Sequence, residues 1–422
     1  MVQAEHRSRY RGLSSGLRRI LPVVALCALV AACGGRPTGV LGAVAQTDAD
    51  ATEVKMLVAT TRAPSDDPNI LFTGERGSNV SLTSFTVSIP PDDRRQIGQV
   101  QWPTRLPANP QTDFATVAVH PLDSVKAARG WLRTNLPPGK RVMIFVHGFN
   151  NRFEDAVFRF AQIVHDSGAK VAPVLFTWPS RARVFDYLFD RESTIFSRDA
   201  FEETVYQIAT DPDVADVTIM AHSMGAWLAM EGLRQMAIRR GGLPPKIQNV
   251  ILASPDVDVD VFATQWRALN HPTARFTLFT SQNDRALQVS RRIAGNVERL
   301  GQINAEDHYE KLQKAGIVVI DLTAVQSGDA LNHGRFASSP EVVQLIGTRL
   351  VNGQTITDSD VSVGDRIGTV AMGVGQTVGG AAALAISAPI AVFDPNTRRS
   401  YEGQMQQVGR AAGDTVSSPG AQ

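Results

Sequence analysis

One short stretch, DVTIMAHSMGAWL at residues 216–228, constrains the fold more than any other part of the chain. Its first half is an apolar run typical of a buried parallel strand, and its second half continues as a helix. A strand that runs directly into a helix turns sharply at the joining residue, whose side chain then projects above the sheet. The stretch therefore predicts a nucleophile elbow of the G-x-S-x-G type, with Ala221 in the first glycine position and Ser223 as the candidate nucleophile. A serine that only caps the helix is the alternative at this point.

Composition excludes several other functions. The formal net charge of +1 argues against nucleic-acid binding. The only two cysteines, Cys27 and Cys33, lie near the N-terminus, so they build neither a disulfide framework nor a thiolate metal site. The histidines lack the H-E-x-x-H spacing of metal-dependent hydrolases. We therefore expect no metal and no cofactor, and the sequence predicts no particular oligomeric state.

The N-terminus has the features of an export signal. A basic segment precedes the apolar run Ile20–Ala32, which is too short to span a bilayer as a mature helix. The run closes with VAACG at 30–34, which resembles the lipobox of bacterial lipoproteins and implies a lipid attached to Cys33. An ordinary signal peptide is the alternative. We expect residues 1–33 to be the signal and 34–52 a flexible tether, because the latter is rich in Gly, Ala and Thr.

The expected location follows from this signal. A lipid on Cys33 would anchor the chain in the bacterial cell envelope, facing the periplasm. No acidic retention signal follows Cys33, which favours the outer membrane.

Residues 53–352 are expected to form one α/β domain in which strands and helices alternate. Such alternation predicts a mostly parallel, doubly wound sheet with helices on both faces and N-terminal strands at its edge. Residues 71–77 and 181–197 are predicted to be loops, and the second loop is a candidate wall of a substrate pocket. The predicted strands are 54–60, 84–90, 99–102, 115–119, 141–146, 171–178, 217–220, 247–252, 275–280 and 318–322, and the predicted helices are 124–135, 153–166, 200–210, 224–236 and 340–351.

Residues 353–422 differ in composition from the rest of the chain. Ile367–Phe393 carries no charge and is dominated by Gly and Ala. Membrane association through small-residue packing and a low-complexity, disordered tail are both open interpretations. Residues 394–422 are polar and are expected to be disordered.

A catalytic serine needs a base to take its proton and an acid to orient that base. In a doubly wound sheet the useful groups lie at the carboxyl ends of the strands. Asp256 and Asp284 each follow a predicted strand, and His333 follows the last one. The order Ser, Asp, His predicts Ser223, Asp284 and His333 as the triad, with Asp256 as the rival acid. Each aspartate could instead cap a following helix.

Hydrolysis also needs donors for the oxyanion. The backbone N–H of Met224, at the start of the elbow helix, is one candidate. The second is expected in the loop after His147-Gly148, from Phe149 or, next in order, Asn150. His147 itself is interpreted as a structural hydrogen-bonding residue.

Several segments resemble an uncharacterised esterase/lipase-like branch of the α/β-hydrolase superfamily found in bacteria. The resemblance covers residues 54–350 and rests on HGFNNRFEDAVFR, LFTWPS, DRES, AHSMG, ASPDVDVDVF and SQNDRAL, together with VATTRAP and FTGERG. It implies the α/β-hydrolase fold and supports Ser223, Asp284 and His333 as the catalytic residues, but it does not specify a substrate.

The expected function is that of a serine hydrolase that cleaves a carboxylic ester through an acyl-serine intermediate. Thioester, amide and acyl-transfer chemistry use the same triad and stay open. No strongly apolar lid helix is evident in the sequence, which favours a soluble or short-chain ester. The alternative function is a non-catalytic envelope lipoprotein that uses a hydrolase scaffold for binding or assembly.

Overall fold

The computed structural model describes residues 37–45, 48–325, 329–347 and 391–393. The described residues from Val40 onward belong to one compact unit. The predicted signal at 1–33 lies outside the described residues, as does most of 353–422. No helix in the described ranges is long and apolar enough to cross a membrane.

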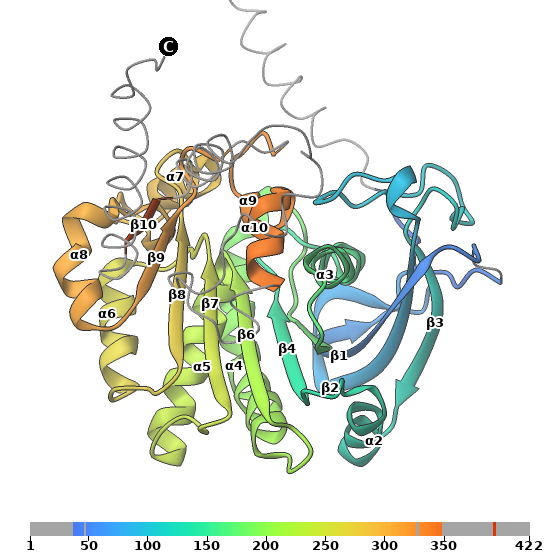
Figure 1. Ribbon diagram of the computed structural model, residues 1–422, viewed down its shortest axis with the longest axis horizontal. Helices are drawn as coiled ribbons and strands as arrows, with labels where there is room; N and C mark the ends of the chain where they lie inside the picture. The colour runs from blue at the N-terminus through green and yellow to red at the C-terminus, as the bar shows by residue number, and fades with distance from the viewer. Residues whose placement is uncertain (1–36, 46–47, 326–328, 348–390, 394–422) are drawn as a thin grey trace, which may run out of the picture. The chain divides into compact units, whose positions relative to one another are not determined.

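The unit is built on a ten-stranded sheet (Figure 1) with the order β10-β9-β8-β7-β6-β4-β5-β1-β2-β3. All neighbouring strands from β9 to β1 pair in parallel, whereas β2 and β3 at one edge and β10 at the other pair antiparallel. The predicted mostly parallel sheet with N-terminal edge strands is therefore confirmed. The strands are β1 (Thr52–Pro64), β2 (Phe72–Ile89), β3 (Ala115–Leu122), β4 (Arg141–Val146), β5 (Ala172–Thr177), β6 (Asp216–His222), β7 (Ile247–Ala253), β8 (Arg275–Thr280), β9 (Val318–Asp321) and β10 (Ala391–Phe393).

Helices cover both faces of this sheet, and each face has its own apolar core. Strand β4 shows why, because alternate side chains point to opposite faces: Ile144 belongs to one core and Phe145 to the other. The first core packs against α2 (Val125–Asn135), α4 (Tyr187–Thr210), α5 (Met224–Arg240), α6 (Val259–Ala268) and α8 (Ala305–Lys314). The second packs against α3 (Phe153–Ser167), α9 (Arg335–Ser338) and α10 (Pro340–Leu345). Helix α7 (Arg285–Ile293) follows β8 at the carboxyl ends of the strands, at the top of Figure 1.

The predicted loop at 181–197 is mostly helix. A short 3-10 turn, η2 (Val184–Asp186), leads directly into α4, which begins at Tyr187 rather than near Ala200. This helix buries hydroxyl groups that bond the preceding turn of its own backbone: Ser193 Oγ donates to the carbonyl of Phe189 at 2.9 Å, and Ser197 Oγ to that of Ser193 at 2.7 Å. Because polar residues occupy buried positions, the apolar periodicity that identifies a helix is lost.

Two further expectations at the N-terminal edge are wrong. Residues 72–77 are strand, because β2 continues to pair with the long β1 as far as the Pro64–Phe72 partners. Residues 99–102 are not strand, because Trp102 packs its ring against Phe158 at 5.4 Å between centroids instead of entering the sheet.

Part of the predicted tether packs on the domain. Val40 and Leu41 are almost fully buried in the second core, and the amide of Leu41 donates to the carbonyl of Asn69 at 3.1 Å. The packed chain therefore begins before Glu53. At the other end, Ala391–Phe393 pair with β9 as β10, and the rest of the Gly/Ala-rich segment lies outside the described residues.

Candidate active site

Ser223 joins β6 to α5 in a strained backbone conformation. Its φ of 54° and ψ of −122° place a non-glycine residue in a sparsely populated region, which the surrounding structure must hold in place. Its amide donates to the carbonyl of Ala253 at the end of β7, at 2.9 Å. Its side chain makes no capping hydrogen bond to α5. Ser223 therefore occupies the N-cap position of α5, but its side chain does not cap the helix.

Two glycines allow the chain to pack closely around this serine. A Cβ added to Gly225 would lie 2.8 Å from the carbonyl oxygen of Val146 and would also collide with the backbone of His147. A Cβ added to Gly148 would lie 2.8 Å from Cβ of Ser223. Both distances are shorter than real Cβ contacts. The glycine of the elbow helix is thus required by the close approach of the end of β4, and the glycine of the loop after β4 by the close approach of Ser223.

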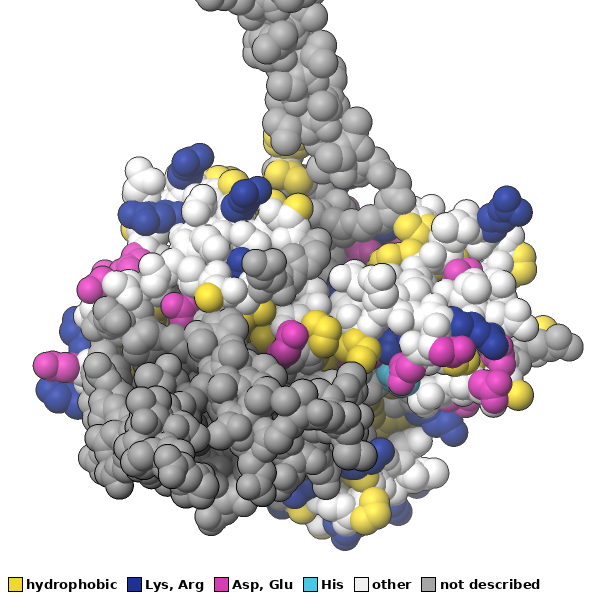
Figure 2. Space-filling model, turned by 45° about the horizontal axis from the view of Figure 1, so that its top comes forward, with side chains coloured by type: hydrophobic (Ala, Val, Ile, Leu, Met, Phe, Trp, Pro, Cys, Tyr) yellow, Lys and Arg dark blue, Asp and Glu magenta, His cyan; other side chains and the backbone are white. Residues whose placement is uncertain are grey.

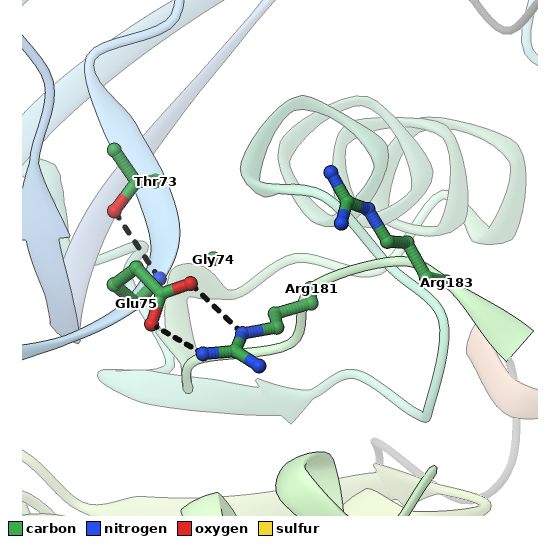
Figure 3. Close-up of a pocket in the computed structure, with 5 residues that line it drawn as sticks. All are labelled: Thr73, Gly74, Glu75, Arg181 and Arg183. Carbon is green, nitrogen blue, oxygen red and sulfur yellow. Dashed lines mark hydrogen bonds and ion pairs between the residues drawn. The ribbon is translucent and has the colours of Figure 1, made fainter. Parts of the chain in front are cut away.

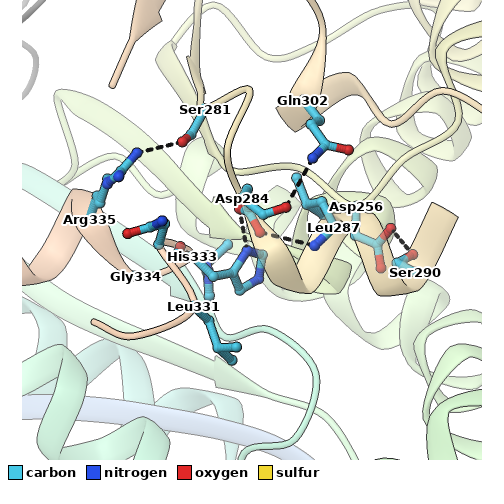
Figure 4. A network of polar contacts seen from close by, with 12 residues as sticks. Asp256, Ser281, Asp284, Leu287, Ser290, Gln302, Leu331, His333, Gly334 and Arg335 are labelled. Atoms are coloured by element: carbon cyan, nitrogen blue, oxygen red, sulfur yellow. Dashed lines mark hydrogen bonds and ion pairs between the residues drawn. The ribbon is translucent and has the colours of Figure 1, made fainter. Parts of the chain in front are cut away.

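Asp284 and His333 meet at the carboxyl ends of β8 and β9 (Figure 4). His333 Nδ1 lies 2.7 Å from Oδ2 of Asp284, whose side chain is fully buried. The other carboxylate oxygen of Asp284 accepts from the amide of Leu287 at 2.9 Å, so Asp284 also caps α7. Both interpretations of this residue, helix cap and partner of a histidine, are correct together.

Burial and the carboxylate act on His333 in opposite directions. Burial lowers the pKa of His333, but the charge of Asp284 and its hydrogen bond raise it, and the net result is a pKa above the ordinary value for histidine. Because Nδ1 faces the carboxylate, Nε2 is the ring nitrogen left to exchange a proton with another group.

The loop that carries His333 is organised by Asp329. One carboxylate oxygen of Asp329 accepts from the amides of His333 and Gly334, both at 2.5 Å. The loop is tied to the end of β8 by Arg335, whose guanidinium donates to Ser281 Oγ at 2.6 Å (Figure 4). These contacts fix the base on a segment that the sequence shows only as a polar loop.

Asp256, the rival acid, has other partners. It accepts hydrogen bonds from Tyr187 at 2.9 Å and Ser290 at 2.5 Å, and it forms an ion pair with the buried Arg299 at 3.3 Å. Burial and the carboxylate raise the pKa of Tyr187 to about 12, so its hydroxyl remains a donor. The geometry therefore assigns Asp284, not Asp256, to His333.

His222, the residue before Ser223, contacts the segment that carries the base. Its Nε2 donates to the carbonyl oxygen of His333 at 3.3 Å, and its ring lies 4.7 Å from that of His333 and 4.6 Å from that of Phe336. Burial, followed by the nearby charge of His333, holds the pKa of His222 well below the ordinary value, so this ring is neutral. No local motif signals such a contact between residues so far apart in the chain.

His147 has the structural role expected of it. Its Nε2 accepts from the amide of Trp178 at 3.2 Å, and its Nδ1 donates to the carbonyl of Gly148 at 2.8 Å. Burial, together with the charge of Arg62, lowers its pKa to about 3. Arg62 is itself buried and donates to the carbonyls of Asn151 and Ser180, at 2.8 and 3.1 Å, which fixes the loops after β4 and β5.

Each of the two predicted oxyanion donors adjoins Ser223 or a residue in close contact with it. Met224 is the first residue of α5, where amides have no intrahelical acceptor, and Phe149 follows Gly148, which contacts Ser223. Asn150 is a poorer candidate than expected, because its amide hydrogen-bonds to the buried carboxylate of Asp190. Among the residues that the structure describes, no group of three or more His, Cys, Asp or Glu side chains is arranged to hold a metal.

Ser223 is strained at a strand–helix turn, and an Asp–His pair lies at the ends of later strands. All three residues are at the carboxyl ends of the strands of a parallel sheet, and this arrangement defines an α/β-hydrolase. Residues 124–349 match the family described as alpha/beta hydrolase of unknown function (DUF900), and the chain belongs to that family.

Other similar proteins are more distant. The chain is 27% identical over 122 residues to an uncharacterized protein (alr1448) of Nostoc sp., a match that covers 23% of this chain and about a third (32%) of the relative. Among solved structures, a Pyrobaculum calidifontis esterase is 14% identical with a TM-score of 0.31, covering 64% of this chain and 81% of the esterase. A fungal esterase from Rhizomucor miehei is 16% identical with a TM-score of 0.32, covering 72% and 82% respectively.

Proposed function

We propose that this hydrolase cleaves a carboxylic ester through an acyl-serine intermediate, with Ser223 as nucleophile, His333 as base and Asp284 as the acid that orients the base. The observation that carries the proposal is the 2.7 Å contact between His333 Nδ1 and Asp284 on the strand edge where Ser223 is held in its strained turn. A carboxylate fixed on Nδ1 leaves Nε2 to work on the serine proton, which is the arrangement that acyl transfer requires.

In the proposed reaction, Ser223 Oγ attacks the ester carbonyl while Nε2 of His333 takes the hydroxyl proton. Asp284 stabilises the imidazolium that forms, and the amides of Phe149 and Met224 donate to the oxyanion. The tetrahedral intermediate collapses, the C–O bond to the alcohol breaks, and His333 returns the proton to the leaving oxygen. Water then attacks the acyl-serine by the same steps, which releases the acid and restores the serine.

Labelling with a fluorophosphonate tests this proposal. The wild-type chain is expected to react, and Ser223→Ala is expected not to, because the phosphonate bonds only to an activated serine. Ser254→Ala is the matched control: Ser254 is also buried, directly follows the neighbouring strand β7 and has a positive φ of 45°. A folded wild-type protein that stays unlabelled would favour the alternative function, a non-catalytic scaffold for binding or assembly.

The pH dependence of activity should follow the raised pKa of His333. Only neutral His333 accepts a proton, so kcat/KM should fall as pH decreases through that pKa, with a midpoint above the ordinary histidine value of about 6.5. Asp284→Asn removes the carboxylate that raises the pKa and should move the midpoint to lower pH. The pH profile of hydrolysis of a soluble activated ester measures both, and an identical midpoint in the two proteins would contradict the assigned pair.

We also propose that Cys33 carries a lipid that anchors the enzyme in the bacterial cell envelope, facing the periplasm. The supporting observation is the apolar run that ends in VAACG. Metabolic labelling with a palmitate analogue in a bacterial host should mark the wild-type chain but not Cys33→Ala, and fractionation of the labelled cells would identify the membrane.

A further inference from the structure

Large apolar side chains are exposed around the carboxyl ends of the strands, where the candidate site lies. In η2 and the start of α4, Val184 is 50% exposed, Phe185 is 100% exposed and Leu188 is 65% exposed. In α7, Val289 and Ile293 are each 50% exposed. Val289 and Ile293 are one helical turn apart and share one face of α7. Each of these side chains would be more stable out of water, so the surface is suited to contact an apolar phase.

Contacts between the two segments make this a single surface. The hydroxyl of Tyr187, the first residue of α4, lies 2.9 Å from Ser290 Oγ in α7. At the start of α7, the amide of Arg285 donates to the carbonyl of Leu331 at 2.9 Å, and the side chain of Leu331 is 52% exposed. We refer to Val184, Phe185, Leu188, Val289, Ile293 and Leu331 as the apolar rim.

The rim adjoins the candidate site directly. Leu331 lies two residues before His333 on the same loop. On the other side, the ring of Phe149 lies edge-on to that of Tyr187, with centroids 5.2 Å apart. A phase that covered the rim would therefore lie beside the His333 loop and the loop that carries Phe149.

Arginines accompany the apolar rim. Arg285, Arg291 and Arg292 are exposed on α7, and residues 285–297 contain no acidic residue, the next one being Glu298. Arg285 and Arg292 lie on the same helical face as Val289 and Ile293. In the view onto this edge of the sheet, hydrophobic and basic side chains lie together at the upper left (Figure 2). The α7 side of the rim thus carries positive charge beside apolar side chains.

A hollow next to η2 is also lined by arginines. It has a volume of 430 Å³ and is lined by Thr73, Gly74, Glu75, Arg181 and Arg183 (Figure 3). Both carboxylate oxygens of Glu75 bind Arg181, at 2.8 and 2.9 Å, so the charges of that pair cancel. Arg183 adds a positive charge to the lining, two residues from the fully exposed Phe185, while Asp186 of η2 lies 3.8 Å from Arg181.

We propose that the apolar rim and its arginines dock on an anionic phospholipid bilayer, with Phe185 and its neighbours inserted among the acyl chains and the arginines at the phosphate groups. Apolar side chains combined with basic ones are the composition that binds the interface of anionic membranes, and each arginine near such a surface contributes separately. The proposal does not depend on catalysis by Ser223. If both hold, docking brings the site to esters in or next to the bilayer.

Local quenching tests the docking. The full chain with Cys33→Ser, which removes the lipid attachment site, also receives Phe185→Trp, and its fluorescence is measured with vesicles of phosphatidylcholine and phosphatidylglycerol that carry brominated acyl chains. We expect added quenching in this protein relative to its parent with anionic vesicles, and little with phosphatidylcholine alone. The matched control is Val125→Trp, because Val125 is 53% exposed on α2, which lies at the end of the sheet away from α7 (Figure 1). The Val125→Trp protein should show no added quenching.

The arginines are tested in the Phe185→Trp protein. Arg285→Gln with Arg292→Gln, which removes the two arginines on the rim face of α7, should raise the lipid concentration for half-maximal quenching about 25-fold, since each arginine contributes roughly a fivefold change. The proposal is overturned if the Phe185→Trp protein shows no added quenching, or if neutral vesicles quench it equally. It is also overturned if sedimentation without lipid shows a dimer that Phe185→Ser dissociates, because the rim would then bind a second copy. Unchanged hydrolysis of a soluble activated ester by the Phe185→Trp protein separates this result from the proposed catalysis.

Discussion

His333→Ala is expected to lower kcat for an activated ester by about 10⁴- to 10⁶-fold, the range for loss of a base from a serine triad. Without the imidazole, nothing takes the proton of Ser223 as it attacks, and the oxyanion donors alone supply the remaining rate. The loss should appear in kcat and in kcat/KM alike, because the base acts in the transition state. Steady-state kinetics with a soluble ester, supported by single-turnover measurement of acyl-serine formation, would measure it.

The fold should survive this substitution. His333 lies on a loop whose shape depends on backbone bonds to Asp329 rather than on the imidazole. The melting temperature should therefore stay close to that of the wild type. His120→Ala is the control, since His120 is exposed on β3 and should change neither quantity. An equal loss of activity in both variants, or a His333→Ala protein that retains full kcat, would remove His333 from the proposed mechanism.

The elbow and the order of the strand ends were readable from the sequence because each depends on local pattern. An apolar run followed by A-H-S-M-G and a helical repeat permits few backbone paths, and Gly225 has a spatial reason in its contact with the carbonyl of Val146. Because strands alternate with helices, the residues that follow parallel strands lie at the same carboxyl ends of the sheet. This places Ser223, Asp284 and His333 together whatever the lengths of the loops. Their catalytic roles remain predictions, but their shared position follows from the fold.

Other parts of the site depend on contacts between distant segments, and no local pattern reports these. His222 contacts the carbonyl of His333, more than a hundred positions along the chain. Tyr187 bonds Asp256 and Ser290 from a segment that was expected to be a loop. Because hydroxyl side chains occupy buried positions of α4, apolar periodicity in the sequence does not identify this part of the helix.

The apolar rim is a surface that no local sequence pattern could predict, for the same reason. The sequence has no single strongly apolar helix that would mark a lid, which favoured a soluble or short-chain ester. Exposed apolar residues nevertheless gather near the site: three come from η2 and the start of α4, two from α7 and one from the His333 loop. Three short contributions from separate segments leave no apolar run, so only the fold combines them.

Asp284→Asn and Asp256→Asn are expected to fail in different ways. Asp284→Asn should lower kcat by about 10⁴-fold, because an amide cannot hold His333 in the required tautomer or stabilise its charged form. Stability should change little, since asparagine caps a helix about as well as aspartate and the bond to the amide of Leu287 is kept. Kinetics on folded protein together with thermal melts would show a loss of activity without a loss of structure.

Asp256→Asn should instead destabilise the fold. Asp256 and Arg299 are each 3% exposed in their side chains and form an ion pair, so the substitution leaves a buried guanidinium without its counter-charge. Removing one partner of a buried pair costs about 3–5 kcal/mol. Denaturant titration should show this loss. At a pH well above the pKa of His333, kcat per folded molecule should stay near the wild-type value, because no hydrogen bond or ion pair of the Asp256 side chain reaches His333 and its charge only adds to the raised pKa of that histidine. The opposite outcome, in which Asp256→Asn abolishes activity at full stability and Asp284→Asn only weakens the fold, would assign Asp256 as the acid. The two carboxylates follow neighbouring strands, and strand order alone favours Asp284, so the partner of each one decides whether it serves the reaction or the fold.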